Sequence, residues 1–257
     1  MLPSPIAIPA FTDNYIWAIA QRDQCVVVDP GDAGPVEQFL QDKGLKLTAI
    51  LVTHHHPDHV GGIATLTQDR DIPVYGPANE TIPCMTQPLE DAQQITLHAL
   101  DLTLKVMEVP GHTLGHIAYY DDQNGWLFCG DTLFAAGCGR LFEGTPSQMY
   151  TSLHRLAELP GQTLVYCTHE YTRANLEFAV AVTPEDQRVQ ARLAAVKAAR
   201  EEGQITLPTT LAEECRTNPF LRTGEAVVQA ACEAREPGAG FDDVQCFASL
   251  RRWKDNF

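Results

Sequence analysis

The residues best suited to chemistry lie in segment 53–59, which has the sequence THHHPDH and directly follows an apolar, strand-like run at 48–53. Alternate side chains of an extended chain lie on the same side, so His54 and His56 can converge on one metal ion. The proline that follows turns the chain, and Asp58 and His59 then face another direction. This arrangement favours a second ion close to the first.

Three further candidate ligands each come just after an apolar run typical of a strand, and they are His112, Asp131 and His169. Loops at strand ends commonly carry functional groups. Seven ligands are too many for one ion, so the sequence predicts two. We expect Asp131 to bridge two ions about 3.5–4 Å apart, with three more ligands on each: His54, His56 and His112 on the first, and Asp58, His59 and His169 on the second.

The other histidines have no ligand position in this scheme and are interpreted as loop or structural residues: His55, His98, His116 and His154. Cys129 and Cys138 lie near the predicted site, and we interpret both as packing residues. The competing interpretation of segment 53–59 is a solvated polar loop that only scavenges metal. Convergence of the later ligands disfavours it.

Up to about residue 172, short β-branched or aromatic runs alternate with turn clusters, which is typical of a layered α/β fold. The predicted strands are 15–20, 24–29, 48–53, 102–109, 117–120, 126–129 and 164–167. A helix is predicted at 35–43, because Val36, Phe39 and Leu40 share one face and Gly44 follows as a stop.

The chain beyond Tyr171 is predicted to be helical, with helices at 173–182, at 184–202, after residue 210 and at about 242–254. Thr183 is the expected N-cap of the second of these, and Pro184 would occupy its first turn. We therefore expect two domains, one at 1–172 that carries the predicted metal ligands and a helical one at 173–257.

The bulk composition narrows the class of partner. The 257 residues carry a formal net charge of −15, which opposes binding to nucleic acid. No secretory signal and no apolar stretch of membrane-spanning length is visible. Eight scattered cysteines without a C-x-x-C pair favour buried, reduced thiols. We expect a cytoplasmic protein that acts as a monomer on a small molecule.

Segment 53–59 matches the T-H-x-H-x-D-H motif of the metallo-β-lactamase fold superfamily, and the three later ligands follow in the family's order. Within that superfamily the chain closely resembles glyoxalase II, the hydroxyacylglutathione hydrolases. Further shared motifs are DNY at 13–15, GDTLF at 130–134, CGR at 138–140, FEG at 142–144, HEYT at 169–172, NPFLR at 218–222 and a basic tail at 251–254.

The resemblance implies an αββα sandwich that carries two divalent metals, zinc or alternatively iron or manganese, followed by a helical domain that helps to bind glutathione. The implied substrate is S-lactoylglutathione, split into lactate and glutathione in the second step of methylglyoxal detoxification. The matched positions that would contact the substrate are Arg140, Phe142, Tyr171, Arg251 and Lys254. Phe142 replaces a tyrosine found in relatives, which is expected to reduce affinity.

The predicted chemistry suits a thioester. Two cations would make a shared water largely hydroxide near neutral pH, with Asp131 bridging them and Asp58 orienting the nucleophile. The leaving thiol has a pKa of about 8.5, so strong acid assistance is dispensable. Arg251 and Lys254 share one face of the last predicted helix, whereas Arg252 points away from it.

Three other functions compete with this one. A persulfide dioxygenase of the same fold would use a single iron, which the apparently full ligand set and the long helical C-terminus disfavour. A nucleic-acid-processing metallohydrolase is disfavoured by charge. A metal-binding module without activity is the remaining alternative, and turnover of a thioester would exclude it.

Overall fold

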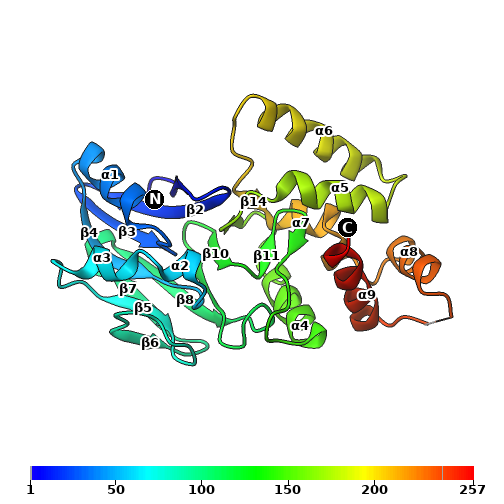
Figure 1. The fold of residues 1–257 in the computed structure, drawn as a ribbon, viewed down its shortest axis with the longest axis horizontal. Coiled ribbons are helices and arrows are strands. Elements are labelled where there is room, and N and C mark those ends of the chain that lie inside the picture. The colour runs from blue at the N-terminus through cyan, green and yellow to red at the C-terminus, as the bar shows by residue number, and fades with distance from the viewer. Residues whose placement is uncertain (1, 239) are drawn as a thin grey trace. The chain divides into compact units, whose positions relative to one another are not determined.

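The computed structural model describes residues 2–238 and 240–257. These residues form two compact units (Figure 1). Unit 1 comprises the chain up to Glu108 together with Leu114–Gly130, and unit 2 comprises Val109–Thr113 together with Asp131–Phe257.

Unit 1 contains two sets of neighbouring strands. The first is a six-stranded sheet in the order β1 to β6, antiparallel at β1, β2 and β3 and parallel from β3 onward. Its strands are β1 Ile6–Ala10, β2 Asn14–Gln21, β3 Gln24–Val28, β4 Lys46–Leu51, β5 Val74–Pro77 and β6 Gln87–Leu89. The second set is antiparallel and consists of β7 Gln94–Leu97, β8 Leu102–Glu108, β9 Ile117–Asp121 and β10 Trp126–Gly130.

Helices cover one face of the first sheet: α1 Ala33–Lys43, α2 Pro57–Val60 and α3 Ile63–Thr67. Val36 and Leu40 of α1 pack into a core with Ile50 of β4. Gly44 ends α1 in the left-handed conformation with φ 64°, as its sequence predicts. On the other face of the sheet, the Tyr119 hydroxyl of β9 donates to the carbonyl of Val52 over 2.8 Å, which joins the two strand sets of unit 1.

Unit 2 is largely helical. Its elements are α4 Pro146–Ala157, α5 Thr172–Val182, α6 Gln187–Glu201, α7 Leu211–Thr217, α8 Ala226–Arg235, α9 Asp243–Asp255, the 3-10 turn η2 Pro219–Leu221 and the strands β11 Leu133–Phe134, β12 Gly137–Cys138, β13 Leu164–Cys167 and β14 Thr209–Thr210. α5 and α6 pack against each other through Leu176, Ala179, Val189 and Val196. A capping box between Asp242 and Gln245 begins α9.

The seven predicted strands and the helix at 35–43 are confirmed, and their ends agree with the structure to within two residues; the run at 48–53, for example, forms β4. The predicted start of the second C-terminal helix is wrong. Thr183 closes α5 instead, and Asp186 caps α6 by accepting from the Arg188 backbone N–H. Helices α4 and α8 were not predicted, although Thr145 and Gln148 form a capping box at the start of α4 and Pro146 occupies its first position.

The cysteines are free thiols, but the prediction that all are buried is wrong for two of them. Cys84 and Cys215 are exposed, and the other six are buried. Burial raises the pKa of Cys138 to about 11 and that of Cys25 to about 12, which makes these two poor nucleophiles. No helix among the described residues combines the length and apolarity needed to cross a bilayer.

Candidate metal centre and substrate cavity

The ligand-rich segment of unit 1 begins where β4 ends and is fixed there by one buried carboxylate. Asp29, just after β3, accepts the backbone N–H of Thr53 over 2.8 Å and the Thr53 hydroxyl over 2.8 Å. Helix α2 then starts at Pro57, which suits a first helical turn because proline has no N–H to satisfy there. The strand end and the short helix together hold the side chains between them.

The four candidate ligands of this segment lie together. The Nε2 atom of His54 is 3.1 Å from Nδ1 of His56, in agreement with the alternation expected for an extended segment. The His54 and His59 rings are 4.0 Å apart, and His59 Nε2 is 3.6 Å from a carboxylate oxygen of Asp58. Unit 1 thus gathers imidazole nitrogens and one carboxylate within the space of a metal site.

Contacts with Thr53 and Asp29 determine which ring nitrogen of His54 and of His59 faces the cluster. The Thr53 hydroxyl gives its only proton to Asp29, so it accepts the one on His54 Nδ1, 3.0 Å away. His59 Nδ1 lies 3.1 Å from Asp29 Oδ2, the same oxygen that accepts the Thr53 hydroxyl. Both rings therefore present an Nε2 lone pair, the arrangement that metal-ligating histidines require.

Other polar residues support the cluster from behind. The side-chain amide of Asn14 donates to Asp58 over 3.0 Å, and His55 Nδ1 lies 3.0 Å from Glu80. His116 stacks on His54 with ring centroids 4.6 Å apart. These contacts agree with the interpretation of His55 and His116 as supporting residues. The sequence analysis missed the role of Asp29, and the available signal was an aspartate directly after a buried strand.

Gly62, three residues after segment 53–59, allows a close approach of two backbone segments. A Cβ there would lie 2.6 Å from the carbonyl oxygen of Pro30, well inside contact distance. Any larger residue would push α2 away from the loop that carries Asp29.

Unit 2 brings together the three candidate ligands that are far apart in sequence. His112 Nε2 is 3.5 Å and His169 Nε2 is 3.3 Å from the same oxygen of Asp131, and all three residues are buried. Gly111 precedes His112 with φ 154°, and a Cβ at this glycine would lie 2.7 Å from Met149. The tight turn at Gly111 therefore places His112 beside the carboxylate.

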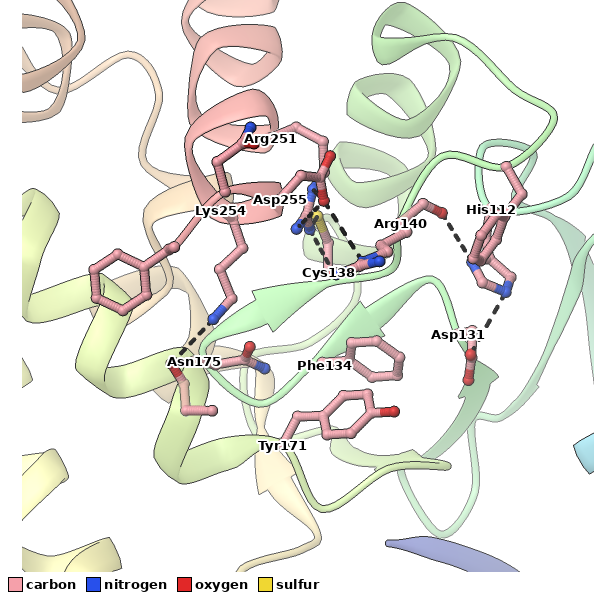
Figure 2. Close-up of a pocket in the computed structure, with 14 residues that line it drawn as sticks. His112, Asp131, Phe134, Cys138, Arg140, Tyr171, Asn175, Arg251, Lys254 and Asp255 are labelled. Atoms are coloured by element: carbon pink, nitrogen blue, oxygen red, sulfur yellow. Dashed lines mark hydrogen bonds and ion pairs between the residues drawn. The ribbon is translucent and has the colours of Figure 1, made fainter. Parts of the chain in front are cut away.

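The tautomer of His112 is set by a backbone group. Its Nδ1 donates to the carbonyl of Arg140 over 2.8 Å, which leaves Nε2 as the lone-pair atom facing Asp131 (Figure 2). His169 is held differently. Its ring stacks on Tyr171 with centroids 4.7 Å apart, and the edge of Phe134 packs against it at 5.7 Å.

Both ligand sets have the chemistry of a divalent metal site. Each combines neutral imidazoles, oriented by a hydrogen bond or a stacked ring, with a carboxylate. Such nitrogen and oxygen donors suit zinc, iron and manganese. The residues of this chain therefore fit the divalent metal that the sequence motif implies.

A cavity of about 550 Å³ opens in unit 2 beside His112 and Asp131 (Figure 2). This volume is in the range of small-molecule sites. The remaining lining residues are Phe134, Cys138, Arg140, Phe142, Tyr171, Ala174, Asn175, Arg251, Lys254, Asp255, Asn256 and Phe257. The five residues that the resemblance assigned to substrate are thus all in the wall of one cavity.

These five residues differ in exposure. Phe142 and Tyr171 are exposed at 64% and 38%, whereas Arg251 is exposed at only 5%. Lys254 donates to the carbonyl of Ala174 over 3.1 Å, and burial, followed by the neighbouring charge of Arg251, lowers its pKa. Arg252 does not line the cavity and pairs with Glu236 at the surface, which confirms the prediction that it points away.

Comparisons with known proteins were made on sequence and on structure. Residues 10–169 match the model of the metallo-beta-lactamase superfamily, and residues 170–257 match that of the hydroxyacylglutathione hydrolase C-terminus. A hydroxyacylglutathione hydrolase of Cupriavidus taiwanensis is 55% identical over 260 residues, which cover 97% of each chain.

Two solved structures show the same fold. ETHE1 from Myxococcus xanthus superposes with a TM-score of 0.65 at 24% identity, covering 99% of this chain and 98% of its own. TTHA1623 in a di-iron-bound form superposes with a TM-score of 0.60 at 28% identity, covering 85% of this chain and all of its own.

These matches confirm the expected fold class, an α/β sandwich of the metallo-β-lactamase type followed by a helical C-terminal region. The two family models meet at residues 169 and 170 and together cover nearly the whole chain. With a relative more than half identical over almost its full length, this chain belongs to the hydroxyacylglutathione hydrolases of the metallo-β-lactamase superfamily.

Proposed function

We propose that this chain hydrolyses S-2-hydroxyacylglutathione thioesters, typically S-lactoylglutathione, to a 2-hydroxy acid and glutathione, and so catalyses the second step of methylglyoxal detoxification. One observation carries the proposal. A single cavity has candidate metal ligands, His112 and Asp131, in one part of its wall and the cations Arg140 and Lys254 in another. A hydrolytic centre and a docking surface for carboxylates therefore border the same space.

We infer that the two ligand sets complete one binuclear centre. In this proposal Asp131 would bridge the two ions, with His54, His56 and His112 as the further ligands of the first and Asp58, His59 and His169 as those of the second. The di-iron form of the structural relative supports a count of two. Zinc is the metal we propose, with iron or manganese as alternatives that the same donors accept. When bound, such ions lower the pKa of a water to about 7 and polarise a carbonyl.

The chain's own residues supply the rest of the reaction. Asp58, steadied by the Asn14 amide, orients the attacking water through its carboxylate. The cavity holds the acyl carbon next to the ligands by binding the glutathione part of the substrate. The departing thiolate belongs to a thiol of pKa about 8.5, so no general acid is needed beside it.

Arg140 and Lys254 bind the carboxylates of glutathione in this proposal, and Phe142, Tyr171 and Arg251 complete the wall. Arg140 is well placed because its side chain is largely exposed. Phe142 packs edge-on against His112 at 5.3 Å but offers no hydroxyl to the substrate. We therefore expect Phe142 to make only hydrophobic contact with the substrate, and the substrate to bind more weakly than it would beside a hydroxyl group.

The same proposal divides the chain into a catalytic part, 1–172, and a helical substrate-binding part, 173–257. The adjoining family models at residues 10–169 and 170–257 support that division. We further propose that the protein acts as a monomer in the cytoplasm. The prevalence of free thiols agrees with a reducing compartment.

The test is hydrolysis of S-lactoylglutathione by metal-replete protein, followed as release of free thiol and combined with elemental analysis. We expect turnover with two metal ions per chain. The single-iron persulfide dioxygenase is disfavoured by the hydroxyacylglutathione hydrolase relatives and by the match at 170–257. One iron per chain with oxygen uptake, and no thioester cleavage, would reject the hydrolase.

A further inference from the structure

A fully buried carboxylate of α7, that of Glu214, has its two oxygens bonded to different parts of unit 2. Oε1 accepts from the Arg192 guanidinium of α6 over 2.5 Å and from the Thr209 hydroxyl of β14 over 2.8 Å. Oε2 accepts from the backbone N–H of Ala136 over 2.7 Å and from the Asn218 side-chain amide over 3.1 Å. One oxygen is thus tied to α6 and β14, and the other to the turn at Ala136.

This turn belongs to the hairpin of β11 and β12, which has little support of its own. The two strands are two residues long each and form a separate two-stranded sheet. Isolated hairpins are marginal in water even when they are longer. Ala136, in the turn between the strands, has a φ of 57°, in the left-handed region that residues with a side chain rarely adopt. The hairpin therefore depends on hydrogen bonds from outside for its shape.

Side chains from other elements supply those hydrogen bonds. The amide of Asn218, directly after α7, donates to the carbonyls of Gly137 and Phe134 over 2.9 and 3.3 Å. Asn175 of α5 donates to a third hairpin carbonyl over 3.0 Å. Because Asn218 also donates to Glu214, the glutamate holds the hairpin twice, once directly and once through this amide.

The hairpin is connected to all three candidate metal ligands of unit 2. Asp131 lies two residues before β11. Two residues after β12, the carbonyl of Arg140 accepts the proton of His112 Nδ1 over 2.8 Å (Figure 2). In β11 itself, the edge of Phe134 packs against the His169 ring with centroids 5.7 Å apart. The position of the hairpin therefore bears on each ligand, through the chain, a hydrogen bond or a ring contact.

The two ends of the hairpin are in direct contact with each other. The N–H of Gly139 donates to the carbonyl of Thr132 over 3.2 Å. A Cβ at this glycine would lie 1.9 Å from the carbonyl oxygen of Asp131, so the two backbones touch. Close-packed interiors transmit strain. A shift of the turn is therefore passed to Asp131 on one side and to segment 138–140 on the other.

We propose that Glu214 is a positioning residue for the metal ligands of unit 2, acting by holding the β11–β12 hairpin against the helices. This inference rests on the proposed function only in taking Asp131, His112 and His169 as metal ligands. Glu214 itself is a structural anchor outside the reacting groups. The sequence analysis gave it no role, because its four hydrogen-bond partners come from four separate parts of the chain.

The arrangement requires a carboxylate, because both oxygens act as acceptors. In Glu214→Gln, the remaining oxygen is expected to stay with the charged Arg192, since hydrogen bonds to ions are stronger than neutral ones. The amide NH2 then faces the backbone N–H of Ala136, which sets a donor against a donor. The variant therefore releases the hairpin side while it keeps the side toward α6.

The experiment compares Glu214→Gln with Thr209→Val, a control of similar shape that removes a hydrogen bond from the Oε1 side only. Zinc affinity is measured by competition with a chelator, under conditions in which circular dichroism shows full folding. For Glu214→Gln we expect zinc affinity to fall about tenfold, at the low end of the effect of losing a group that orients ligands. Its kcat/KM should fall by a similar factor on S-lactoylglutathione and on a lactoyl thioester of a small uncharged thiol.

Thr209→Val is expected to lower the free energy of unfolding in urea and to leave zinc affinity unchanged. The proposal is overturned if Glu214→Gln also lowers only the stability, or if both variants lose zinc affinity equally. A wild type that binds no zinc would overturn it as well. Should the wild type bind zinc but cleave neither thioester, the proposed function fails, while the zinc measurements still decide the role of Glu214.

Asn218→Ser provides a second variant in case the loss of a buried charge prevents folding. Serine keeps an oxygen that can cap the 3-10 turn η2, where Asn218 now accepts from the Phe220 N–H. It is too short to reach the hairpin carbonyls, and Glu214 keeps its bond to Ala136. A smaller loss of zinc affinity in the same direction is expected. Wild-type affinity in this variant, with reduced stability alone, would contradict the proposal.

Discussion

The two ligand sets are organised in opposite ways. In unit 1, four candidate ligands occur within residues 54–59, and one buried side chain, Asp29, holds both the segment and a histidine ring. In unit 2, three ligands come from residues 112, 131 and 169, and a backbone carbonyl orients His112. The geometry of a compact ligand set can depend on a single supporting residue, whereas the geometry of a dispersed set depends on how several loops and helices hold the backbone.

This difference determines where substitutions should act. Removing the Asp29 carboxylate deprives Thr53 of its acceptor and removes the oxygen that lies beside the His59 ring. The carbonyl of Arg140 belongs to the backbone and is present whatever side chain stands at that position. A substitution that disturbs the orientation of His112 must therefore act on the residues that hold backbone segment 138–140.

The largest effect is expected where the dispersed set converges. Asp131→Ala removes the oxygen that both His112 and His169 approach. We expect metal content to fall below two ions per chain and kcat to drop about a thousandfold, since metal stabilisation of the reacting groups contributes several kcal/mol. Elemental analysis and steady-state kinetics check this, and retention of both quantities would remove the bridging role.

A smaller effect is expected for Asp29→Asn, which keeps the side-chain shape but replaces one acceptor oxygen with a donor group. Because Asp29 orients His59, zinc affinity should fall about tenfold to a hundredfold. Arg140→Ala is the contrasting variant. Its carbonyl remains, so zinc affinity should be kept while KM for the glutathione thioester rises. Equal loss of zinc affinity in both variants would show that the two sets are held in the same way.

The smallest expected effect is on the stability of unit 2, through the network at the start of α6. Hydrogen bonds from Arg188 and from the buried Arg222 hold the pKa of Asp186 well below its usual range. A carboxyl whose pKa is lower in the folded state stabilises the fold above its unfolded pKa of about 3.9. That stabilisation is lost as pH falls from there toward the folded value.

Asp186→Asn, which keeps a capping side chain, should therefore reduce the free energy of unfolding by about 1–2 kcal/mol at pH 7. The difference from wild type should shrink below about pH 4. Urea unfolding at several pH values measures this. The matched control is Asp242→Asn at the cap of α9, with an expected cost of about 0.5 kcal/mol or less; a pH-independent loss at position 186 would contradict the charge argument.

Prediction from sequence succeeded where the signal was local. The alternation of His54 and His56, the strands around them and the glycine stop of α1 all follow from neighbouring residues. It failed at α6, because Asp186 is a better cap than Thr183 when Arg188 and Arg222 donate to it. Arg222 is 36 residues away, and no local pattern reveals such a partner.

Residue types and spacing alone predicted a metal centre, because several imidazoles and carboxylates gathered at strand ends form a donor set that divalent metals accept. Tertiary structure decided which ring nitrogens of the candidate ligands face one another and which hydrogen-bond partners the cavity-lining cations have. Arg251 and Lys254 are equivalent in the sequence pattern and both line the cavity, yet the Arg251 guanidinium is buried between Asp255 and Cys138 while the Lys254 ammonium donates to the carbonyl of Ala174. The physical reason is that hydrogen bonds between distant segments fix tautomers and occupy donors, and only folding brings those segments together.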